Sequence, residues 1–382
     1  MRDGGTCASK HIIWTHDGSP VIAVIGGGVV GLASALAIAR RGRPVCVLER
    51  HRRPGLETST HNSGVIHAGL YHPATSLKTM LCRDGAARLY HFCEAHRVPH
   101  LRCGKLIVAG AGDIGELDRL ETRARENGAE VERVDRAFVT AREPHVAAAE
   151  ALWSPRTGWV DTEALLRALA AEVARHDGVI VAGTAVVGIE PGPGTAIALI
   201  TPRERIDAHC CVNAAGLFAD EVSALAGGER FAIYPCRGEY AELAPRARHL
   251  VKGLVYPVPH ASGHGLGVHL TRTLGGAVWI GPTIGYQDSK TDYEGGRLPL
   301  DAFLAPTRAL LPAVTIDDLR LGGSGIRPKL HPPTDRFADF LIRRDSLNPA
   351  LVHAAGIDSP GLTACLAIGE RVADIAMDGM VG

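Results

Sequence analysis

Three glycines near the start of the chain have the types and spacing needed to bind a diphosphate. Gly26, Gly28 and Gly31 form a G-x-G-x-x-G pattern. The first glycine permits a tight turn, the second lets a pyrophosphate approach the backbone, and the third lets a helix pack closely on a strand. Free N–H groups at the start of the helix then hold the anion. The spacing predicts a dinucleotide site at Gly26, Gly28, Val30 and Gly31.

The segments around these glycines have the pattern of a β-α-β unit. Residues 21–25 are an apolar, mostly β-branched run, as expected for a buried parallel strand, and residues 32–40 are rich in Ala and Leu. A second apolar strand at 45–48 closes with Glu49, 18 residues after Gly31. A carboxylate there can accept hydrogen bonds from the adenosine ribose, and it disfavours NADP. The alternative is a glycine-rich loop without a ligand, which this context disfavours.

Three features favour FAD over NAD as the dinucleotide. About 350 residues follow the fingerprint. A strand-like segment at 210–213 leads into a small-residue turn with Ala215 and Gly216, and a second one at 351–355 leads into another turn. The second turn opens a predicted helix, 364–376, whose positive end would face the anionic N1–C2=O edge of a reduced flavin. We expect this edge to meet Ser359, Pro360, Gly361, Leu362 and Thr363.

Composition narrows the classes of protein further. The chain has 382 residues, 46% hydrophobic and 21% charged, which is typical of two or three globular units. Lys plus Arg and Asp plus Glu both number 41, so no nucleic-acid partner is expected. Nine cysteines without a C-x-x-C pair argue against a disulfide framework or a metal site and favour a reducing compartment.

The uncharged run at 21–39 has the length of a membrane span. Four glycines in fingerprint spacing interrupt it, so we assign it to the nucleotide fold instead. Peripheral contact with a membrane stays open. The protein is expected in the cytoplasm or at the inner membrane of a bacterium, or in the mitochondrion of a eukaryote. Residues 1–20 leave the presence of a transit peptide undecided.

A resemblance to a known family rests on several later motifs. Residues 61–72 read H-N-S-G-V-I-H-A-G-L-Y-H, and residues 103–109 read C-G-K-L-I-V-A. Further matches are R-G-E-Y at 237–240, G-V-H-L-T at 267–271 and G-I-R-P at 325–328. From residue 21 onward the chain resembles the L-2-hydroxyglutarate dehydrogenase/oxidase family, within the D-amino-acid-oxidase-like superfamily. The chain departs from the family pattern at 283–287 and 356–361, which bears on the substrate more than on the reaction type.

The resemblance implies bound FAD, no nicotinamide, and oxidation of an L-2-hydroxy acid to a 2-oxo acid. It also implies electron transfer to a quinone, another carrier or oxygen. Val186 and Val187 are expected to meet the adenine through their backbone groups. Further contacts with the cofactor are expected from Glu49, Arg50, Thr60, His61, Asn62, Ser63, Gly325 and Arg327.

We predict an α/β fold with a Rossmann-like FAD-binding domain, discontinuous in sequence, and a substrate domain built on a mostly antiparallel sheet. Helices are expected at 114–127 and 162–176, the second with Asp161 as N-cap, and residues 288–312 read as polar and helical. Residues 179–189 read as one strand-like segment. The FAD-binding domain is assigned 21–110, 161–230 and 321–382, the cap elements 111–160, and the substrate sheet 231–320.

Oxidation of an α-hydroxy acid requires a base for the hydroxyl proton and an anchor for the carboxylate. Histidine is the natural base near neutral pH, and His67 and His269 are the best candidates among 18 histidines. Arg327 is the preferred anchor, because a guanidinium binds a carboxylate in bidentate geometry. A hydrogen-bonded structural histidine and a surface arginine are the alternatives. Further substrate contacts are expected from Tyr71, Arg237, Tyr240, Tyr256 and Arg272.

Two other functions remain open. One is an FAD-dependent amine, amino-acid or glycerol-3-phosphate oxidoreductase of the same fold, whose flavin would bleach with those substrates instead. The other is a non-catalytic flavin- or nucleotide-binding protein, such as a partner in tRNA modification or assembly, whose flavin would bleach with no small acid.

Overall fold

The glycine-rich turn lies at the carboxyl end of a central strand in a six-stranded sheet. The computed structural model describes residues 21–192, 196–259 and 267–378. In this sheet β1 pairs in parallel with β2 and β13, β9 extends the β2 side, β21 extends the β13 side, and only β20 is antiparallel. In spatial order the strands are β20 (Leu341–Arg344), β21 (Leu351–Ala355), β13 (Cys210–Asn213), β1 (Ile22–Ile25), β2 (Val45–Glu49) and β9 (Val179–Ala182).

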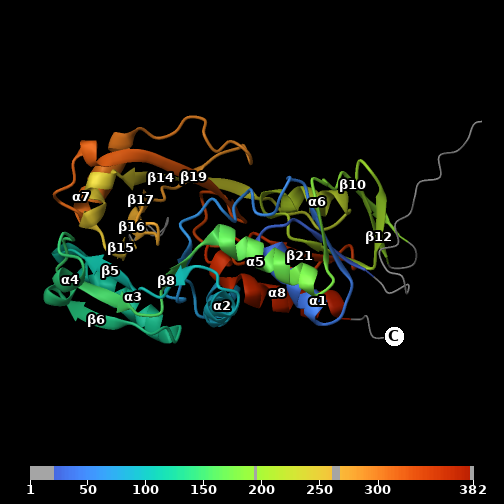
Figure 1. Ribbon diagram of the computed structural model, residues 1–382, viewed down its shortest axis with the longest axis horizontal. Helices are drawn as coiled ribbons and strands as arrows, with labels where there is room; N and C mark the ends of the chain where they lie inside the picture. Colours follow the sequence, from blue (N-terminus) through green and yellow to red (C-terminus); the bar gives the residue numbers. More distant parts are fainter. Residues whose placement is uncertain (1–20, 193–195, 260–266, 379–382) are drawn as a thin grey trace, which may run out of the picture.

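Helices α1, α5 and α8 contact this sheet, helix α2 packs on α8, and together with the sheet they form the nucleotide half of the molecule (Figure 1). The helices are α1 (Val29–Arg40), α2 (Leu77–Ala95), α5 (Thr162–Arg175) and α8 (Gly361–Met377). Glycines allow α8 to pack closely against α2 and α1. A Cβ on Gly85 of α2 would lie 2.6 Å from Ala364 Cα of α8, and one on Gly369 would lie 2.5 Å from the carbonyl oxygen of Ala33 in α1. The first, middle and last parts of the chain thus share one core.

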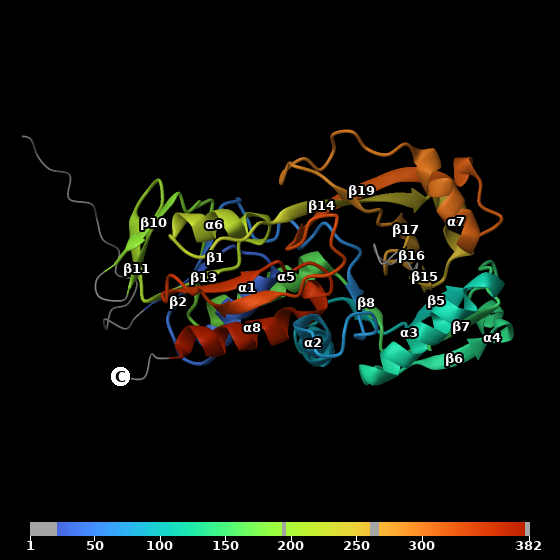
Figure 2. The ribbon, with the colours of Figure 1, turned by 180° about the vertical axis from the view of Figure 1, so that it is seen from behind.

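A nine-stranded sheet forms the substrate half, at the other end of the elongated molecule (Figure 2). Neighbouring strands are antiparallel except β5 and β15, which are parallel. Helix α7 (Leu304–Leu310) covers this half beside the long pair β14–β19 (Figure 2). The strands are β18 (Gly285–Tyr286), β14 (Tyr234–Leu243), β19 (Leu319–Lys329), β17 (Val278–Gly281), β16 (His269–Arg272), β15 (Leu254–Pro257), β5 (Lys105–Ala109), β7 (Glu150–Ser154) and β6 (Glu132–Asp135).

Two small sheets complete the described chain. One contains β10 (Gly188–Pro191), β11 (Ile197–Ile200) and β12 (Arg205–Ala208), and the other contains β3 (Val65–Ile66), β8 (Gly158–Val160) and β4 (His100–Leu101). No helix in the described ranges is long and apolar enough to cross a membrane. Residues 1–20, for which the sequence left a transit peptide open, lie outside the described residues.

The fold class predicted from the sequence is confirmed: a discontinuous parallel nucleotide sheet joins a mostly antiparallel sheet. Helix α3 (Ile114–Glu126) and helix α5 lie where the spacing of apolar residues predicts them, and the Asp161 carboxylate accepts a hydrogen bond from Ala164 N as the N-cap of α5. The domain boundaries stay predictions. Strand β5 lies in segment 21–110 and most of β19 lies in segment 321–382, both of which were assigned to the FAD-binding domain. In the structure both strands belong to the nine-stranded sheet of the substrate half.

Two predictions of local structure were wrong. Residues 179–189 form not one strand but two, β9 and β10, which belong to different sheets. Most of 288–312 is not helical: residues 288–299 form a loop that hydrogen bonds fasten to β14, and only a 3-10 turn, Leu300–Phe303, and the short α7 follow. The polar residues there belong to a loop that is held by hydrogen bonds: Arg237 donates to loop carbonyl oxygens, and Arg297 of the loop donates to Glu239 of β14.

Candidate active site

One cavity of about 1100 Å³ runs from the fingerprint glycines in the nucleotide half to the sheet of the substrate half. Segments far apart in the sequence line it, including the fingerprint turn, the run after β2, the turn after β13, strands β14 to β16 and β19, and the turn before α8. Predicted site residues on its wall are Gly26, Gly28, Val30, Glu49, Arg50, His61, Asn62, Ser63, His67, Tyr71, Ala215, Gly216, Tyr240, Tyr256, His269, Gly325, Arg327, Ser359, Pro360, Gly361 and Leu362.

The glycine turn has the close contacts that a dinucleotide fingerprint requires. Gly26 has φ +108°, and a Cβ there would lie 2.4 Å from the carbonyl oxygen of Ala214. A Cβ on Gly31 would lie 1.9 Å from the carbonyl oxygen of Gly26, so only glycine lets α1 approach the strand. Gly28 faces the cavity at the start of α1, where free N–H groups can bind an anion. The bare backbone here fits a diphosphate.

Glu49 is fixed at the end of β2 by backbone donors. Its Oε2 accepts a 2.7 Å hydrogen bond from Gly27 N, and its Oε1 accepts a 2.8 Å bond from His51 N. The carboxylate therefore stays on the cavity wall, where a ribose would lie. Ser59 completes this end, because its hydroxyl oxygen lies 3.0 Å from the backbone nitrogen of Val29.

The other end of the nucleotide site is the start of α8. This helix has 17 residues, and Gly361 and Leu362 of its first turn line the cavity. Its N-terminal N–H groups place a positive partial charge on the wall, which fits a flavin ring that becomes anionic on reduction. Thr363 holds this turn against β3: its hydroxyl donates to Val65 O at 3.3 Å and accepts from His67 N at 3.0 Å.

His269 lies on β16 in the wall of the substrate half. Its Nδ1 is 3.0 Å from the carbonyl oxygen of Gly267, and because a carbonyl can only accept, Nδ1 carries the proton. Nε2 of the neutral ring is therefore an acceptor. The pKa of His269 is lowered to about 3, mainly by burial, with smaller contributions from the cations Lys105 and Arg327. His269 has the protonation state that a general base requires.

His67 lies nearer the start of α8, with its Nε2 3.4 Å from the hydroxyl of Ser359. Burial, followed by the charge of Lys105, holds the pKa of His67 well below its usual value. Its ring is thus also neutral. The structure brings both predicted histidines to one cavity, at the junction between the flavin end and the substrate sheet.

Arg327 extends from β19 into the same cavity. A Cβ on Gly238, on the paired strand β14, would lie 2.7 Å from the guanidinium of Arg327, so the missing side chain leaves room for this group. The guanidinium donates to the carbonyl oxygen of Thr283 over a distance of 3.4 Å. Among the described residues no carboxylate forms an ion pair with Arg327. The guanidinium is therefore available to an anion in the cavity.

Three predicted tyrosines line the substrate end. The ring of Tyr256 stacks on His269 with centroids 3.7 Å apart, and Tyr240 packs edge-on against Trp279 at 5.1 Å. Tyr71 accepts a 2.9 Å hydrogen bond from Lys105, a fully buried lysine behind the wall. The three phenols add hydroxyl groups to this part of the wall.

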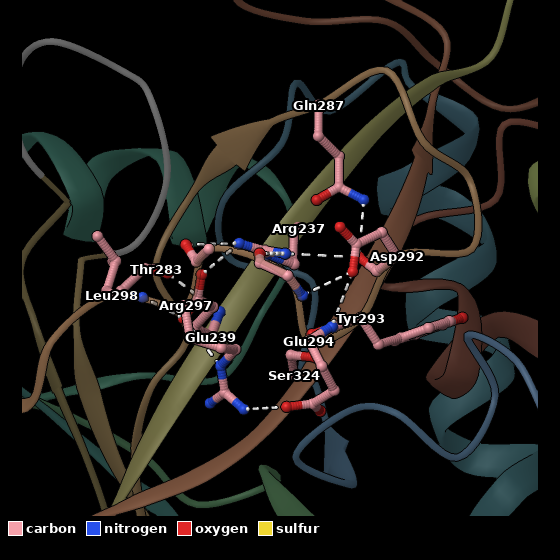
Figure 3. Close-up of polar contacts among 12 residues, drawn as sticks. Arg237, Glu239, Thr283, Gln287, Asp292, Tyr293, Glu294, Arg297, Leu298 and Ser324 are labelled. Atoms are coloured by element: carbon pink, nitrogen blue, oxygen red, sulfur yellow. Dashed lines mark hydrogen bonds and ion pairs between the residues drawn. The ribbon is translucent and has the colours of Figure 1, made fainter.

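Arg237 and Arg272, which the sequence predicts as substrate contacts, do not line the cavity. Arg237 points to the opposite side of β14, where it donates to Gly295 O at 2.6 Å and to the Glu239 carboxylate at 2.9 Å (Figure 3). Arg272 donates to the carbonyl oxygens of Arg248 and Val251. Both arginines are used to hold backbone carbonyls in place.

Four residues expected at the cofactor lie outside the wall: Gly31, Thr60, Val187 and Thr363. Gly31 and Thr363 act through packing and hydrogen bonds, as described above. Thr60 donates to Gly55 O at 2.7 Å, and Val187 faces solvent at 55% exposure, while Val186 lines the cavity. Of the two residues expected at the adenine, Val186 therefore lies on the cavity wall and Val187 does not.

Several wall residues were not predicted from the sequence, including Thr58, Ser59, Lys78, Phe218, Lys329 and Asp358. Thr58 and Ser59 had a signal, because they directly precede the predicted run at 60–63. Asp358 and the two lysines form a buried ion-pair group: Lys78 Nζ lies 2.7 Å and Lys329 Nζ 3.1 Å from the Asp358 carboxylate. These charges come from three distant segments, so no local pattern reveals them.

A histidine and two carboxylates cluster away from this wall. Ligand atoms of Glu229, Asp345 and His353 lie within 4.8 Å of one another. Hydrogen bonds within the fold already engage them: His353 Nε2 is 2.7 Å from Asp345 Oδ2, and Asp345 also accepts from the backbone N–H groups of Leu347 and Asn348. The expectation of no metal site stays a prediction.

Comparisons with known proteins agree with this geometry. The family model described as FAD dependent oxidoreductase matches residues 22–375. The chain is 31% identical to a mitochondrial L-2-hydroxyglutarate dehydrogenase of Caenorhabditis elegans, covering 94% of this chain and 93% of that protein. It is 30% identical to an L-2-hydroxyglutarate dehydrogenase of Indibacter alkaliphilus, covering 93% and 98%.

Solved structures show the same fold. An L-α-glycerophosphate oxidase from Mycoplasma pneumoniae with FAD bound has a TM-score of 0.86 at 24% identity, covering 94% of each chain. A glycine oxidase from Geobacillus kaustophilus has a TM-score of 0.80 at 23% identity, covering 94% of this chain and 95% of the other. The predicted cofactor, FAD, is confirmed, and the chain belongs to the FAD dependent oxidoreductase family, as a relative of the L-2-hydroxyglutarate dehydrogenases.

Proposed function

We propose that this enzyme oxidises the CH–OH group of an L-2-hydroxy acid, with L-2-hydroxyglutarate as the preferred substrate and 2-oxoglutarate as the product. The observation that carries the proposal is one cavity that holds both the neutral ring of His269 and Arg327, which has no ion-pair partner among the described residues. Relatives over nearly the whole chain, from an animal and a bacterium, are L-2-hydroxyglutarate dehydrogenases by name.

Each side chain has a defined task in this reaction. Arg327 binds the carboxylate beside the reacting carbon, because its guanidinium faces the cavity and has no ion-pair partner in the described part of the chain. Nε2 of His269 accepts the hydroxyl proton, since Nδ1 is already occupied by Gly267. The glycine turn and the start of α8 would hold FAD, which when bound would supply the hydride acceptor, N5, that the chain itself lacks. The stacked ring of Tyr256 keeps His269 in place and excludes water.

His67 is the second candidate base. It lies next to Ser359 at the flavin end, and its ring is neutral. We prefer His269, because a fixed tautomer leaves a defined acceptor atom, whereas the 3.4 Å contact of His67 with a hydroxyl leaves either tautomer possible. Electrons would leave the reduced flavin for a quinone, another carrier or oxygen.

Anaerobic titration of the FAD-loaded protein tests the proposal. L-2-hydroxyglutarate should bleach the flavin absorbance and give one equivalent of 2-oxoglutarate, while the D enantiomer at the same concentration should not. Glycine, L-proline and glycerol 3-phosphate serve as comparison substrates for the other oxidoreductases of this fold. Bleaching by one of these and not by L-2-hydroxyglutarate would overturn the proposal, as would a flavin that no small acid reduces.

A further inference from the structure

Lys105 is a buried cation that the proposed reaction does not yet use. It lies at the start of β5 with 0% exposure, and among the described residues no carboxylate forms an ion pair with it. Its ammonium donates to Tyr71 Oη at 2.9 Å and lies over the rings of Tyr71 and Tyr256, 4.7 and 4.4 Å from their centroids. Buried lysines are rare unless paired, because the charge loses its hydration. A role in packing alone does not explain this choice of residue.

Only one layer of side chains separates Lys105 from the cavity. Tyr71, Tyr256 and Cys82 all line the cavity, and Tyr256 also stacks on His269. The charge of Lys105 acts on both histidines of the site, lowering the pKa of His67 and of His269. The ammonium thus lies behind the part of the wall where the substrate is proposed to bind.

The hydrogen bond between Lys105 and Tyr71 has a fixed direction while the lysine is charged. An ammonium can only donate, so the phenol oxygen accepts, and the phenol hydrogen remains free to donate elsewhere. An anion in the cavity is the natural acceptor for that hydrogen. Once Lys105 loses its proton, the amine can accept from the phenol, and the donor would turn away from the cavity.

Resting on the proposed function, we propose that Lys105 is a positioning residue for the anionic substrate. Its charge makes the substrate end of the cavity electropositive, and its hydrogen bond aims the Tyr71 hydroxyl at a substrate carboxylate. Arg327 and Lys105 would then supply positive charge from two sides, β19 and β5, which suits a dicarboxylate better than a monocarboxylate.

The other titratable groups around Lys105 stay neutral near pH 7. Burial raises the pKa of Cys82 to about 12 and raises those of Tyr71 and Tyr256, while it lowers that of His269 to about 3 and that of His67 well below its usual value. Burial also lowers the pKa of Lys105 to about 7. Below that pH the lysine is charged, and above it the charge is lost, so substrate binding should weaken as the pH rises through neutrality.

Steady-state kinetics with L-2-hydroxyglutarate test this role. For the wild type, kcat/KM should fall by up to about tenfold per unit above pH 7, mainly through KM. Lys105→Met should lower kcat/KM at pH 6 by about 10- to 100-fold and remove the pH dependence. Lys105→Arg should restore part of the loss and stay independent of pH to about pH 9, because arginine keeps its charge. Lys252→Met, at an exposed lysine, is the matched control and should behave as the wild type.

Two kinetic outcomes would overturn the proposal. One is a profile in Lys105→Met that matches the wild type. The other is a wild-type kcat/KM that rises with pH near neutrality and loses this rise in Lys105→Met, which would make Lys105 a proton acceptor instead.

A second measurement does not depend on turnover. In the FAD-loaded protein with ¹³C at lysine Cε, one resonance that is absent from Lys105→Arg should titrate near pH 7, and 2-oxoglutarate or lactate should move that titration to higher pH. A resonance that titrates near the ordinary lysine value, or does not respond to either carboxylate, contradicts the proposal. If L-2-hydroxyglutarate fails to reduce the flavin but this resonance still responds to a carboxylate, the proposed substrate is wrong and the role of Lys105 stands.

Discussion

Each face of the β14–β19 ladder carries an arginine, but the two arginines have different surroundings. Arg327 pairs in register with Cys236, and its guanidinium faces the cavity next to Gly238. Arg237, one position along, faces the opposite side, where the Glu239 carboxylate binds it and Arg297 (Figure 3). On the cavity face the arginine has no ion-pair partner among the described residues, and on the outer face the charges are compensated.

This difference shows that a residue's neighbours, not its type, decide between a functional and a structural arginine. In a strand, consecutive side chains point to opposite faces, so a shift of one position exchanges the two environments. The outer face holds the loop at 288–298 against the sheet, and the cavity face leaves a charge for the substrate. Substitutions on the two faces should therefore change different measurements.

The largest effect is expected on the cavity face. Arg327→Leu should lower kcat/KM for L-2-hydroxyglutarate by about 100- to 1000-fold, because a substrate carboxylate would lose its charged partner in a buried site. Bound FAD, read from the flavin-to-protein absorbance ratio, should remain near one per chain. Arg237→Leu is the matched control, and its kcat/KM should stay within about threefold of the wild type. Equal losses in the two variants would contradict the distinction between the faces.

The next effect is on stability and belongs to the outer face. Glu239 is buried and pairs with both Arg237 and Arg297, so Glu239→Gln leaves the partly buried Arg237 without a counter-charge and leaves Arg297 paired only with the exposed Glu294. The free energy of unfolding should fall by about 2–3 kcal/mol, measured by urea denaturation of the FAD-loaded protein. The pH dependence of kcat/KM should keep its wild-type shape. Unchanged stability would mean that the ion pairs of the outer face contribute nothing net.

A smaller loss is expected for Arg237→Leu. This change removes the hydrogen bonds to the carbonyl oxygens of Gly295 and Gly296 but leaves Glu239 paired with Arg297. The free energy of unfolding should fall by about 1–2 kcal/mol. Limited proteolysis should cut the loop at 288–298 faster than in the wild type, whereas the Arg327→Leu loop should resist cleavage as before. Equal cleavage rates in all three proteins would show that Arg237 does not hold the loop.

The nucleotide half was readable from the sequence because its chemistry is local. Gly26, Gly28, Gly31 and Glu49 lie within one β-α-β unit, and backbone groups do the binding. Helix α2 was missed although Ser76 is its N-cap, accepting from Thr79 N, because Gly85 interrupts the helical pattern. Only the packing of Gly85 on α8 explains that glycine.

The substrate half was less predictable because its chemistry depends on which side chains are buried and on which face of a strand each side chain lies. Arg237 and Arg327 stand in similar sequence settings, and nothing local tells which of them faces the cavity. Lys105 lies inside the quoted motif at 103–109, where a lysine at the start of a strand is ordinarily an exposed residue. Its burial follows from the parallel pairing of β5 with β15, which joins segments about 150 residues apart.

The smallest effect is a shift in the titration of His269, which reports the charge of the cavity face. Burial is the main cause that lowers the pKa of His269 to about 3, and Arg327 adds to it. Since the base must be unprotonated, kcat/KM should stay level between about pH 4 and pH 6 and fall only as the pH drops toward 3, instead of falling near the ordinary histidine value of about 6.5.

Arg327→Leu removes a nearby cation, so its acid limb should move to higher pH. Arg237→Leu should leave the limb in place, because Arg237 faces the other side of the ladder. Imidazole ¹⁵N shifts of the FAD-loaded proteins measure the same titration directly, and a His269 pKa near 6.5 in the wild type would mean that the cavity face does not hold the base neutral as the geometry requires.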